Sequence, residues 1–403
     1  MAETYDGGLA GPPAVPTEPC SRPIRVLFHE DPGPGVGGSR RSLFHLIRGL
    51  GANVEATVVG GFPVEWIRRL SDTTLVITPS RVWPPRTPSR LGRAGLTAQW
   101  FWYMATTVLR LLWVIHRRRI DLVHANNEVT ANAPAIVAAK LAGRPCVCHL
   151  RGESQPWRET RWLFKLVDHY IAISQEVGEF YGKQGLLPSD AVSIIHNGVD
   201  VQDLERRAED AGRPASEGWR VGMFGRMIEF KGHQFFLEAA AQVIRRRAGV
   251  EFVIYGPVPT PGDELWPYYD LMCRKVDELG LRDHVSFAGP YSDVAQVMRA
   301  TDIVACSSPY SNLGRIVIEA MACGVSLVAF DVGGMAEMAS NRVNCLLVGN
   351  CDTEAMAAAV IELIEDASLR QSVIKGGHET ARRLFDYRRN AAQVLELYRR
   401  LLN

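Results

Sequence analysis

Residues 307–338, SSPYSNLGRIVIEAMACGVSLVAFDVGGMAEM, carry the pattern that decides the fold. A polar loop leads into a helical pattern that begins at Arg315, and a short apolar run, 326–330, follows that helix. A glycine pair, Gly333 and Gly334, then opens another helix. Short apolar strands that alternate with helices are typical of parallel sheets covered by helices on both faces.

The same alternation runs through the chain in two series. Strands are predicted at 24–29, 54–59, 74–78, 121–124, 145–149, 170–173 and 192–196, and then at 220–224, 251–255, 285–287, 302–306, 326–330 and 344–348. Helical patterns such as 42–50, 233–247 and 352–365 lie between them. The sequence therefore predicts the α/β class, with two Rossmann-like domains whose parallel sheets face each other across a cleft.

The domain boundaries follow from length and local composition. A chain of 403 residues fits two domains of ordinary size, and the polar, charged segment 203–218 near its middle is typical of a linker. We predict a disordered leader at 1–22, an N-terminal domain at 23–205, a linker at 206–218, a C-terminal domain at 219–386 and a closing helix at 387–403.

Composition excludes several classes of protein. Hydrophobic residues make up 47% and charged residues 22%, which is the mixture of a globular protein rather than a disordered or collagenous one. The net charge of +1 argues against nucleic-acid binding by bulk charge. The eight cysteines lack the spacing of a zinc site, so we predict core residues in a reducing cytoplasm and no metal centre.

The first glycine-rich loop, after strand 24–29, contains a formal GxGxxG at Gly33, Gly35 and Gly38. Pro34 stiffens this loop, and the next strand ends in glycines without an acidic residue for a ribose, which argues against a nicotinamide cofactor. Gly37 and Gly38 could instead let the backbone approach a phosphate or a substrate. A flexible loop that merely closes a turn is the alternative.

Two further segments could hold a diphosphate. Arg226 and Lys231 lie at the end of strand 220–224 beside a helix start, and two cations there suit a diphosphate, although they could be ordinary surface charges. In the second segment, Gly314 permits close backbone approach and the helix from Arg315 presents N–H groups to an anion. Glu319, one turn further on, could accept hydrogen bonds from a ribose diol or be an ordinary helix glutamate.

Taken together, these segments resemble the retaining, nucleotide-sugar-dependent glycosyltransferases of family 4, which have the GT-B fold. The matching motifs are GVGGSRRSLFHLIRGL, DLVHANN, IAISQEV, IHNGVD, GMFGRMIEFKGH, FAGPYSDVAQVMRATDIVACSS, LGRIVIEAMACGVSLVAFDVGGMAEM and RLFDYRRNAAQVLELYRRL, which span nearly all of 24–402. The resemblance implies an acceptor-binding N-terminal domain, a nucleotide-sugar-binding C-terminal domain and a closing helix that crosses back to the N-terminal domain.

The resemblance also implies roles for individual residues. Donor-binding positions are Gly37, Gly38, Arg226, Lys231, Asn312, Leu313, Gly314, Arg315 and Glu319. His149 is the best match to a first-domain active-site histidine, and His124 competes with it. Ser311 stands where the family has a glutamate that contacts the donor sugar, and it is our second catalytic candidate. A serine cannot supply the charge of a carboxylate, which leaves three alternatives. The donor has an unusual hydroxyl pattern, a carboxylate such as Glu153 comes from elsewhere in the chain, or the enzyme is weak or inactive.

The implied reaction moves a hexose-type sugar from a nucleotide-diphosphate sugar to an acceptor hydroxyl, with retention and without metal or other cofactor. The acceptor could be a polysaccharide, a glycolipid or other lipid-linked molecule, or a small natural product. Two alternatives stay open: a GT-B-fold sugar-nucleotide epimerase, and a weakly active or inactive sugar-nucleotide binding protein.

The acceptor side contains an arginine-rich stretch, 73–120, with eight Arg and no Asp or Glu. Its segment 99–119, QWFWYMATTVLRLLWVIHRRR, is too short and too interrupted to span a membrane. We prefer the interpretation that it is a packed first-domain helix. The alternative is an amphipathic helix on an anionic bilayer, anchored by Trp100, Phe101, Trp102 and Tyr103, which would place the protein at the inner face of the membrane.

Overall fold

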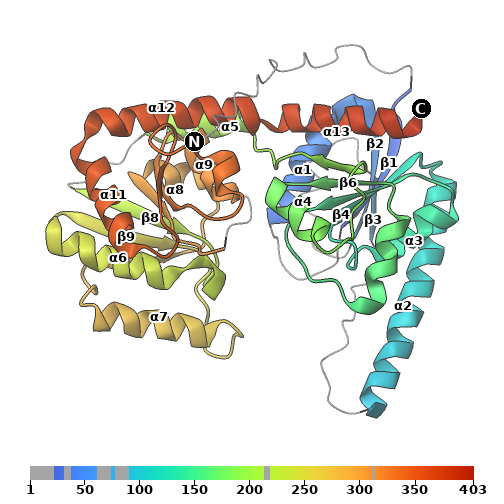
Figure 1. Cartoon of the computed structure of the whole chain (residues 1–403), viewed down its shortest axis with the longest axis horizontal. Coiled ribbons are helices and arrows are strands. Elements are labelled where there is room, and N and C mark those ends of the chain that lie inside the picture. The colour runs from blue at the N-terminus through green and yellow to red at the C-terminus, as the bar shows by residue number, and fades with distance from the viewer. Residues whose placement is uncertain (1–21, 31–37, 61–73, 78–89, 213–217, 311–313) are drawn as a thin grey trace. The chain divides into compact units, whose positions relative to one another are not determined.

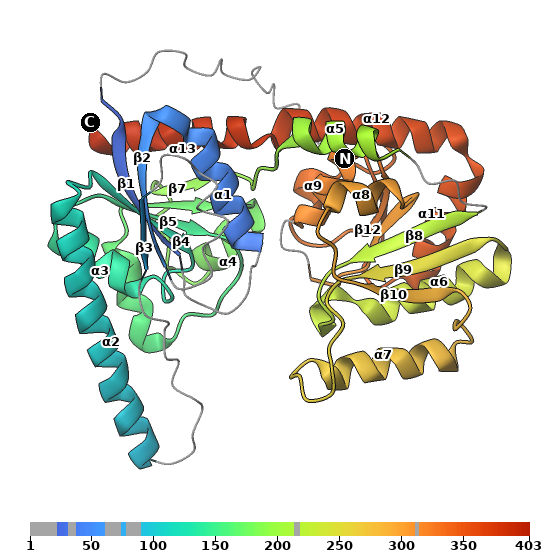
Figure 2. The ribbon, with the colours of Figure 1, turned by 180° about the vertical axis from the view of Figure 1, so that it is seen from behind.

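A computed structural model describes residues 22–30, 38–60, 74–77, 90–212, 218–310 and 314–403 (Figures 1 and 2). Most of the predicted leader, together with Gly37, Ser311, Asn312 and Leu313, lies outside these residues. Within them, no helix has both the length and the apolar character needed to cross a bilayer.

The first sheet has seven strands in the order β3-β2-β1-β4-β5-β6-β7. They are β1 (Ile24–Glu30), β2 (Val54–Gly60), β3 (Thr74–Ile77), β4 (Leu122–Asn127), β5 (Cys146–Leu150), β6 (His169–Ala172) and β7 (Val192–Ile194). β1 pairs in parallel with β2 on one side and with β4 on the other. Val26 and Phe28 of β1 are fully buried, as expected for a central parallel strand.

The second sheet has six strands in the order β10-β9-β8-β11-β12-β13. They are β8 (Trp219–Phe224), β9 (Val250–Tyr255), β10 (Val285–Gly289), β11 (Ile303–Cys306), β12 (Ser326–Phe330) and β13 (Leu346–Val348). All of their pairings are parallel. The predicted α/β class with two Rossmann-like sheets is therefore confirmed, and each predicted strand overlaps an observed one.

The helices connect these strands. They are α1 (Gly38–Leu50), α2 (Arg90–Arg117), α3 (Ala133–Leu141), α4 (Gln175–Gly182), α5 (Val201–Ala211), α6 (His233–Arg246), α7 (Trp266–Glu278), α8 (Val294–Arg299), α9 (Arg315–Ala322), α10 (Met335–Met338), α11 (Thr353–Glu365), α12 (Ala367–Leu384) and α13 (Tyr387–Leu402). Short 3-10 helices lie at Gly51–Asn53, Arg158–Leu166 and Glu229–Lys231.

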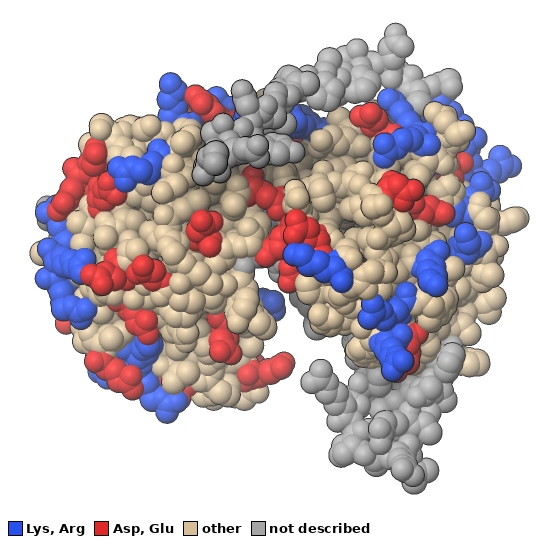
Figure 3. All heavy atoms as spheres, in the orientation of Figure 1, with Lys and Arg blue, Asp and Glu red and all other residues tan. Residues whose placement is uncertain are grey.

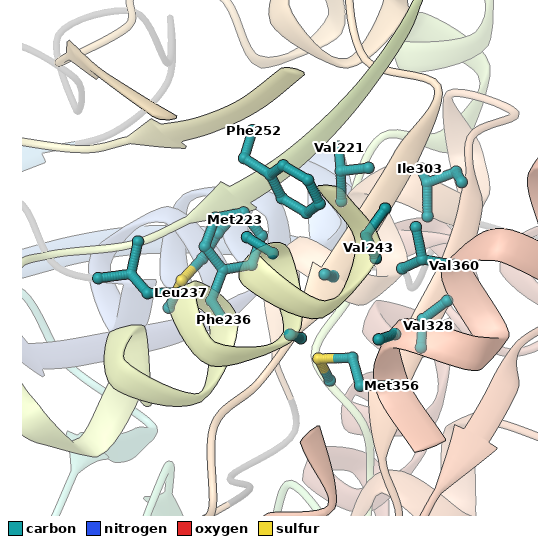
Figure 4. Packing of buried hydrophobic residues seen from close by; sticks show 14 of the residues in the cluster. Val221, Met223, Phe236, Leu237, Val243, Phe252, Ile303, Val328, Met356 and Val360 are labelled. Atoms are coloured by element: carbon teal, nitrogen blue, oxygen red, sulfur yellow. The ribbon is translucent and has the colours of Figure 1, made fainter. Parts of the chain in front are cut away.

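The second sheet packs on a core that its helices complete (Figure 4). Val221 and Met223 of β8 and Phe252 of β9 are almost fully buried, and they share this core with α6 and α11. Phe236, Ala240 and Val243 of α6 repeat at helical spacing, so one face of the helix faces the sheet. Met356 and Val360 of α11 complete the layer.

The chain divides into two compact units. One comprises the described part of Met1–Cys148, Leu166–Asp168 and Tyr387–Asn403, and the other comprises His149–Lys165 and His169–Asp386. Helix α13 therefore groups with the first residues of the chain, and it packs on α1, where Ala391 lies against Gly49. The second unit includes residues 149–165 and 169–205, although β6 and β7 within this range belong to the first sheet. The bounds of the N-terminal domain, 23–205, stay a prediction.

Much of the segment 203–218 is helical rather than an irregular linker. Helix α5 buries Val201, Leu204 and Ala208 on one face, a spacing that the surrounding charges hide in the sequence. Asp203 forms ion pairs with Arg206 at 2.7 Å and Arg207 at 3.2 Å, so the charges stabilise a helix surface. The charged composition of this segment is typical of a linker, whereas the spacing of Val201, Leu204 and Ala208 is that of a helix with one buried face.

Candidate functional site

A cavity of about 460 Å³ lies at the carboxyl ends of β8 and β11. β8 has β9 on one side and β11 on the other, so the connections from the two strands leave in opposite directions at this point. Ligands of open parallel sheets bind in the crevice that forms where the strand order reverses in this way. The position therefore makes this cavity the leading candidate site of the second unit.

The turn after β8 brings Lys231 into this cavity. Gly232, the next residue, has a φ of +71°, and a Cβ there would collide with the carbonyl oxygen of Ser307 at the end of β11. Only glycine allows this close approach of the two connections. The methylene stem of Lys231 lies over Gly225, near enough for a Cβ on Gly225 to contact it at 3.3 Å.

The two predicted diphosphate cations differ in position. Lys231 is half-buried and lines the cavity, whereas Arg226 is exposed and is not among the described residues that line it. Lys231 thus provides the positive charge within the described cavity wall. The role of Arg226 stays a prediction.

The start of α9 forms another wall. Gly314 is the N-cap residue of this helix and lines the cavity. The Arg315 guanidinium donates to Glu319 Oε1 at 3.0 Å, and the two side chains are 14% and 6% exposed. The sequence assigned Arg315 a backbone role only, and it missed that its side chain holds the predicted ribose ligand in place.

Aromatic residues that the sequence analysis overlooked border the same cavity. Phe230 and Tyr310 line it, meet edge to face with ring centroids 5.9 Å apart, and are 65% and 69% exposed. Ser308 Oγ lies 2.6 Å from the carbonyl oxygens of both residues and so ties the two connections together. Their positions in the sequence could have indicated this role, because Phe230 directly precedes Lys231 and Tyr310 directly precedes Ser311.

Glu153, the alternative source of a carboxylate, also lines this cavity. The buried Tyr181 of α4 fixes the backbone on both sides of it, because its hydroxyl donates to Gly152 O and accepts from Ser154 N, each at 3.1 Å. Burial raises the pKa of the Glu176 carboxyl, and the nearby charge of Glu153 adds to this increase. A carboxylate is therefore present at the cavity although position 311 is a serine.

The two candidate histidines have different surroundings. His124 is fully buried, and its Nδ1 lies 2.6 Å from the hydroxyl of Tyr398 on α13, so it serves to attach that helix. His149 is the next-to-last residue of β5 and is 3% exposed. Its Nδ1 lies 3.4 Å from Arg151, whose guanidinium also bonds to Asn197 Oδ1. The described cavity lining does not include His149, and its catalytic role stays a prediction.

In the first unit, a buried carboxylate lies at the start of α1. Glu30 at the end of β1 accepts from Asn126 of β4 and from Ser39 Oγ at 3.3 Å, and Arg40 Nε is 3.7 Å away. Gly38, the first residue of α1, is exposed. Glu30 thus contacts side chains of the first turn of α1, and the role of Gly37 and Gly38 towards a donor phosphate stays a prediction.

Burial controls the titration of two groups beside the cavity. The pKa of His233, which follows Gly232, is lowered from 6.5 to about 4, chiefly by burial and further by the charge of Lys231. Burial raises the pKa of the Cys306 thiol to about 12, against a smaller opposing effect of Lys231. Both groups therefore stay neutral near pH 7. Among the described residues, no cluster of His, Cys, Asp and Glu has the arrangement of a metal site.

Comparisons with known proteins agree with this architecture. The profile described as "Glycosyltransferase Family 4" matches residues 36–203, and that described as "Glycosyl transferases group 1" matches residues 218–366. The chain is 24% identical to 2-deoxystreptamine glucosyltransferase of Streptomyces kanamyceticus, over 88% of this chain and 95% of the relative. It is 33% identical to D-inositol 3-phosphate glycosyltransferase of Saccharomonospora viridis, over 52% of this chain and 50% of the relative.

Solved structures show the same fold. A glycosyltransferase from Rickettsia africae superposes with a TM-score of 0.77 at 17% identity, covering 94% of this chain and 99% of that one. HepE from Anabaena, crystallised with UDP-glucose, superposes with a TM-score of 0.73 at 23% identity, covering 93% and 99%. Both family profiles, in this order on two Rossmann-like sheets, give one conclusion: the chain belongs to the family 4 glycosyltransferases with the GT-B fold.

Proposed function

We propose that this glycosyltransferase transfers a hexose-type sugar from a nucleoside-diphosphate sugar to an acceptor hydroxyl. The observation that carries the proposal is the cavity at the carboxyl ends of β8 and β11, with Lys231 on one wall and the N-terminus of α9 on another. A lysine ammonium and the N–H groups of a helix start both favour a diphosphate. They would also stabilise the charge that develops on it as it leaves.

The test measures UDP and UDP-glucose binding by calorimetry for the wild-type chain and the Lys231→Ala and Arg226→Ala variants. Lys231→Ala should weaken binding at least about tenfold, because it removes a charge-assisted contact with the diphosphate. Lys183→Ala is the matched control, since Lys183 is 77% exposed and pairs with Glu179 on α4. Equal affinities for the Lys231→Ala and Lys183→Ala variants would contradict the proposed donor site.

We propose that the sugar is transferred with retention and without a metal ion, as the family resemblance implies. Lys231 and the start of α9 would supply the positive charge that a divalent cation provides in other transferases. Turnover should therefore persist in EDTA. The NMR coupling constant of the product's anomeric proton should show the donor's configuration, and an inverted product would overturn this part of the proposal.

We further propose that Glu153 supplies the carboxylate that Ser311 lacks, as an acceptor for hydroxyls of the donor sugar. Its support is its place in the cavity wall and the Tyr181 bonds that fix its backbone. Glu153→Gln should lower kcat at least about tenfold while UDP affinity stays unchanged, because UDP lacks the sugar. Glu159→Gln is the control, an exposed glutamate in the following 3-10 helix. Unchanged kcat in Glu153→Gln would refute this role.

The acceptor remains the broadest part of the proposal. The relatives' names, 2-deoxystreptamine glucosyltransferase and D-inositol 3-phosphate glycosyltransferase, refer to cyclohexane rings that carry several hydroxyls. We therefore propose cyclitols as the first acceptors to assay, followed by lipid-linked and polysaccharide acceptors. The cytoplasmic location predicted from cysteine usage stays part of the proposal. An epimerase would instead isomerise the nucleotide sugar without any acceptor, and a binding protein would show no turnover.

A further inference from the structure

Helix α2 has a face that the fold leaves exposed. Trp102, Leu109 and Trp113 are 73%, 66% and 66% exposed, although large apolar side chains are normally buried. At about 100° of rotation per residue, the three side chains lie within an arc of about 40° on the helix surface. They form one stripe, which we call the tryptophan stripe, over about three turns.

The opposite face of α2 carries the packing. Thr107, Val108, Leu111, Val114 and Ile115 are at most 8% exposed, and α2 packs along α3. The same rotation places these residues about 180° from the tryptophan stripe. The stripe is therefore an additional surface that α2 does not use to pack on α3. In Figures 1 and 2, α2 is the long teal helix, and part of it extends past the strands of its unit.

Positive charge lies beside the stripe. Arg110 and Arg117 are exposed and lie within about 80° of it, and Arg118 and Arg119 follow at the exposed end of the helix. The nearby carboxylates Glu55 and Asp121 pair with Arg25 at 3.7 Å and Arg22 at 2.8 Å. Elsewhere the view in Figure 3 shows both signs of charge intermixed. The stretch 73–120 contains eight Arg and no Asp or Glu, so the described part of α2 carries arginine as its charged side chain.

We propose that the tryptophan stripe and Arg117–Arg119 dock this protein on an anionic lipid bilayer. Tryptophan suits the boundary between head groups and acyl chains, because its ring is apolar and its N–H is polar. Arginines beside an apolar stripe attract anionic head groups, and a helix lying in the plane of the interface buries such a stripe. Charge complementarity with anionic lipid favours this occupant over a second copy of the chain, whose matching surface carries the same positive charge.

The structure also selects the anchoring residues. Of the four aromatic anchors suggested by the sequence, Trp102 is exposed, whereas Trp100 and Tyr103 are partly covered, and the Phe101 side chain is not described. Leu109 and Trp113, about two and three turns after Trp102, continue the stripe. The packed-helix and bilayer-surface interpretations thus apply to opposite faces of one helix.

The test is sedimentation of the full chain with vesicles of phosphatidylcholine mixed with phosphatidylglycerol, and with vesicles of phosphatidylcholine alone. Binding should require the anionic lipid and weaken at high salt. The double variant Trp102→Ser and Trp113→Ser should lower partitioning at least about tenfold. The triple variant Arg117→Gln, Arg118→Gln and Arg119→Gln should lower it about a hundredfold.

Two matched controls separate this surface from general stickiness. Trp162→Ser removes another exposed tryptophan, which is 52% exposed. Arg245→Gln, Arg246→Gln and Arg247→Gln remove a second exposed arginine triplet at the end of a helix, α6. Both control variants should bind vesicles like the wild-type chain, and thermal unfolding should show that all variants remain folded.

Three outcomes would overturn the inference. They are no binding to anionic vesicles at low salt, equal loss in the control and stripe variants, and light scattering that shows a dimer dispersed by the tryptophan substitutions. The last outcome would assign the stripe to a second copy of the chain. Because vesicle binding is measured without donor or acceptor, its failure would leave the proposed transfer reaction untouched.

Discussion

Among single residues, Gly232 has little room for change. Its φ of +71° disfavours any L-residue, and a Cβ would also strike the Ser307 carbonyl oxygen. Gly143 provides a matched case, since its φ is +62° but its Cβ would meet nothing within 4 Å. Substitution of Gly143 introduces backbone strain alone, whereas substitution of Gly232 introduces backbone strain and a steric collision, so the difference between them measures the collision.

We therefore expect Gly143→Ala to cost about 1–2 kcal/mol of folding free energy, from the left-handed backbone alone. Gly232→Ala should cost more, and it should also weaken UDP binding, because the turn that carries Lys231 must move away from β11. Thermal unfolding and calorimetry of both variants measure the difference. Equal destabilisation and equal UDP affinity would show that the collision is relieved without moving the site.

His233 makes stability depend on pH. The folded state keeps its imidazole neutral down to about pH 4, whereas the unfolded chain binds the proton at its ordinary pKa of 6.5. As pH falls from 6.5 to about 4, the unfolded state takes up this proton first, so stability decreases, and below about pH 4 the contribution no longer changes.

His233→Leu should therefore lose less stability than the wild-type chain between pH 6.5 and pH 4. Urea unfolding at a series of pH values measures this difference. His284→Leu, a substitution of a histidine that is only half-buried, is the control. A wild-type pH slope that persists unchanged in His233→Leu would contradict the assigned cause.

At the scale of elements, Asp293 connects α5 to α8. Its carboxylate caps α8 by accepting from Ala295 N at 2.9 Å and Gln296 N at 3.3 Å, and it pairs with Arg207 of α5 at 2.5 Å. The hydrogen bond from Arg207 lowers the pKa of Asp293. Helix α5, which lies in the segment that has the composition of a linker, is thus attached through Arg207 to the residue that caps α8.

Asp293→Ala removes both the cap and the ion pair, and we expect a loss of about 1–2 kcal/mol. Asp293→Asn keeps a capping oxygen and removes only the charge, so the expected loss is less than about 1 kcal/mol. Thermal unfolding at low and high salt distinguishes them, since only the wild-type pair should weaken with salt. If both variants lose the same stability, the cap contributes nothing.

At the scale of the whole molecule, the chain's last helix belongs with its first strands. Ala391, Val394, Leu395 and Tyr398 repeat at helical spacing on α13 and are at most 5% exposed. Tyr398 bonds to His124 of β4, a residue 274 positions earlier. The last segment of the first unit, Tyr387–Asn403, therefore follows all residues of the second unit in the sequence.

Deletion of 387–403 should loosen the first unit selectively, because it exposes the apolar surface of α1 and removes the partner of His124. Hydrogen exchange should show lost protection in β1, β2 and β4, with β8, β9 and β11 still protected. Deletion of Asn403 alone is the control. Equal loss in both sheets would mean that α13 supports the whole chain rather than one unit.

The sequence by itself determined the two series of strands and helices and the motifs at the strand ends. These are local patterns, since apolar spacing along a segment reports which of its faces is buried. It could not separate His124 from His149, pair Arg315 with Glu319, or recognise α5 within a charged segment. Those features depend on partners or packing that only the folded chain brings together.

Helix α2 shows the same limit. Its composition fitted both a packed helix and a bilayer-binding helix, and only the tertiary structure decided which side chains are buried and which face outward. The physical reason is that a helix buries one face at a time, and the neighbour that covers it, here α3, is chosen by the fold. Sequence determined what each segment is, and tertiary structure determined what each side chain touches.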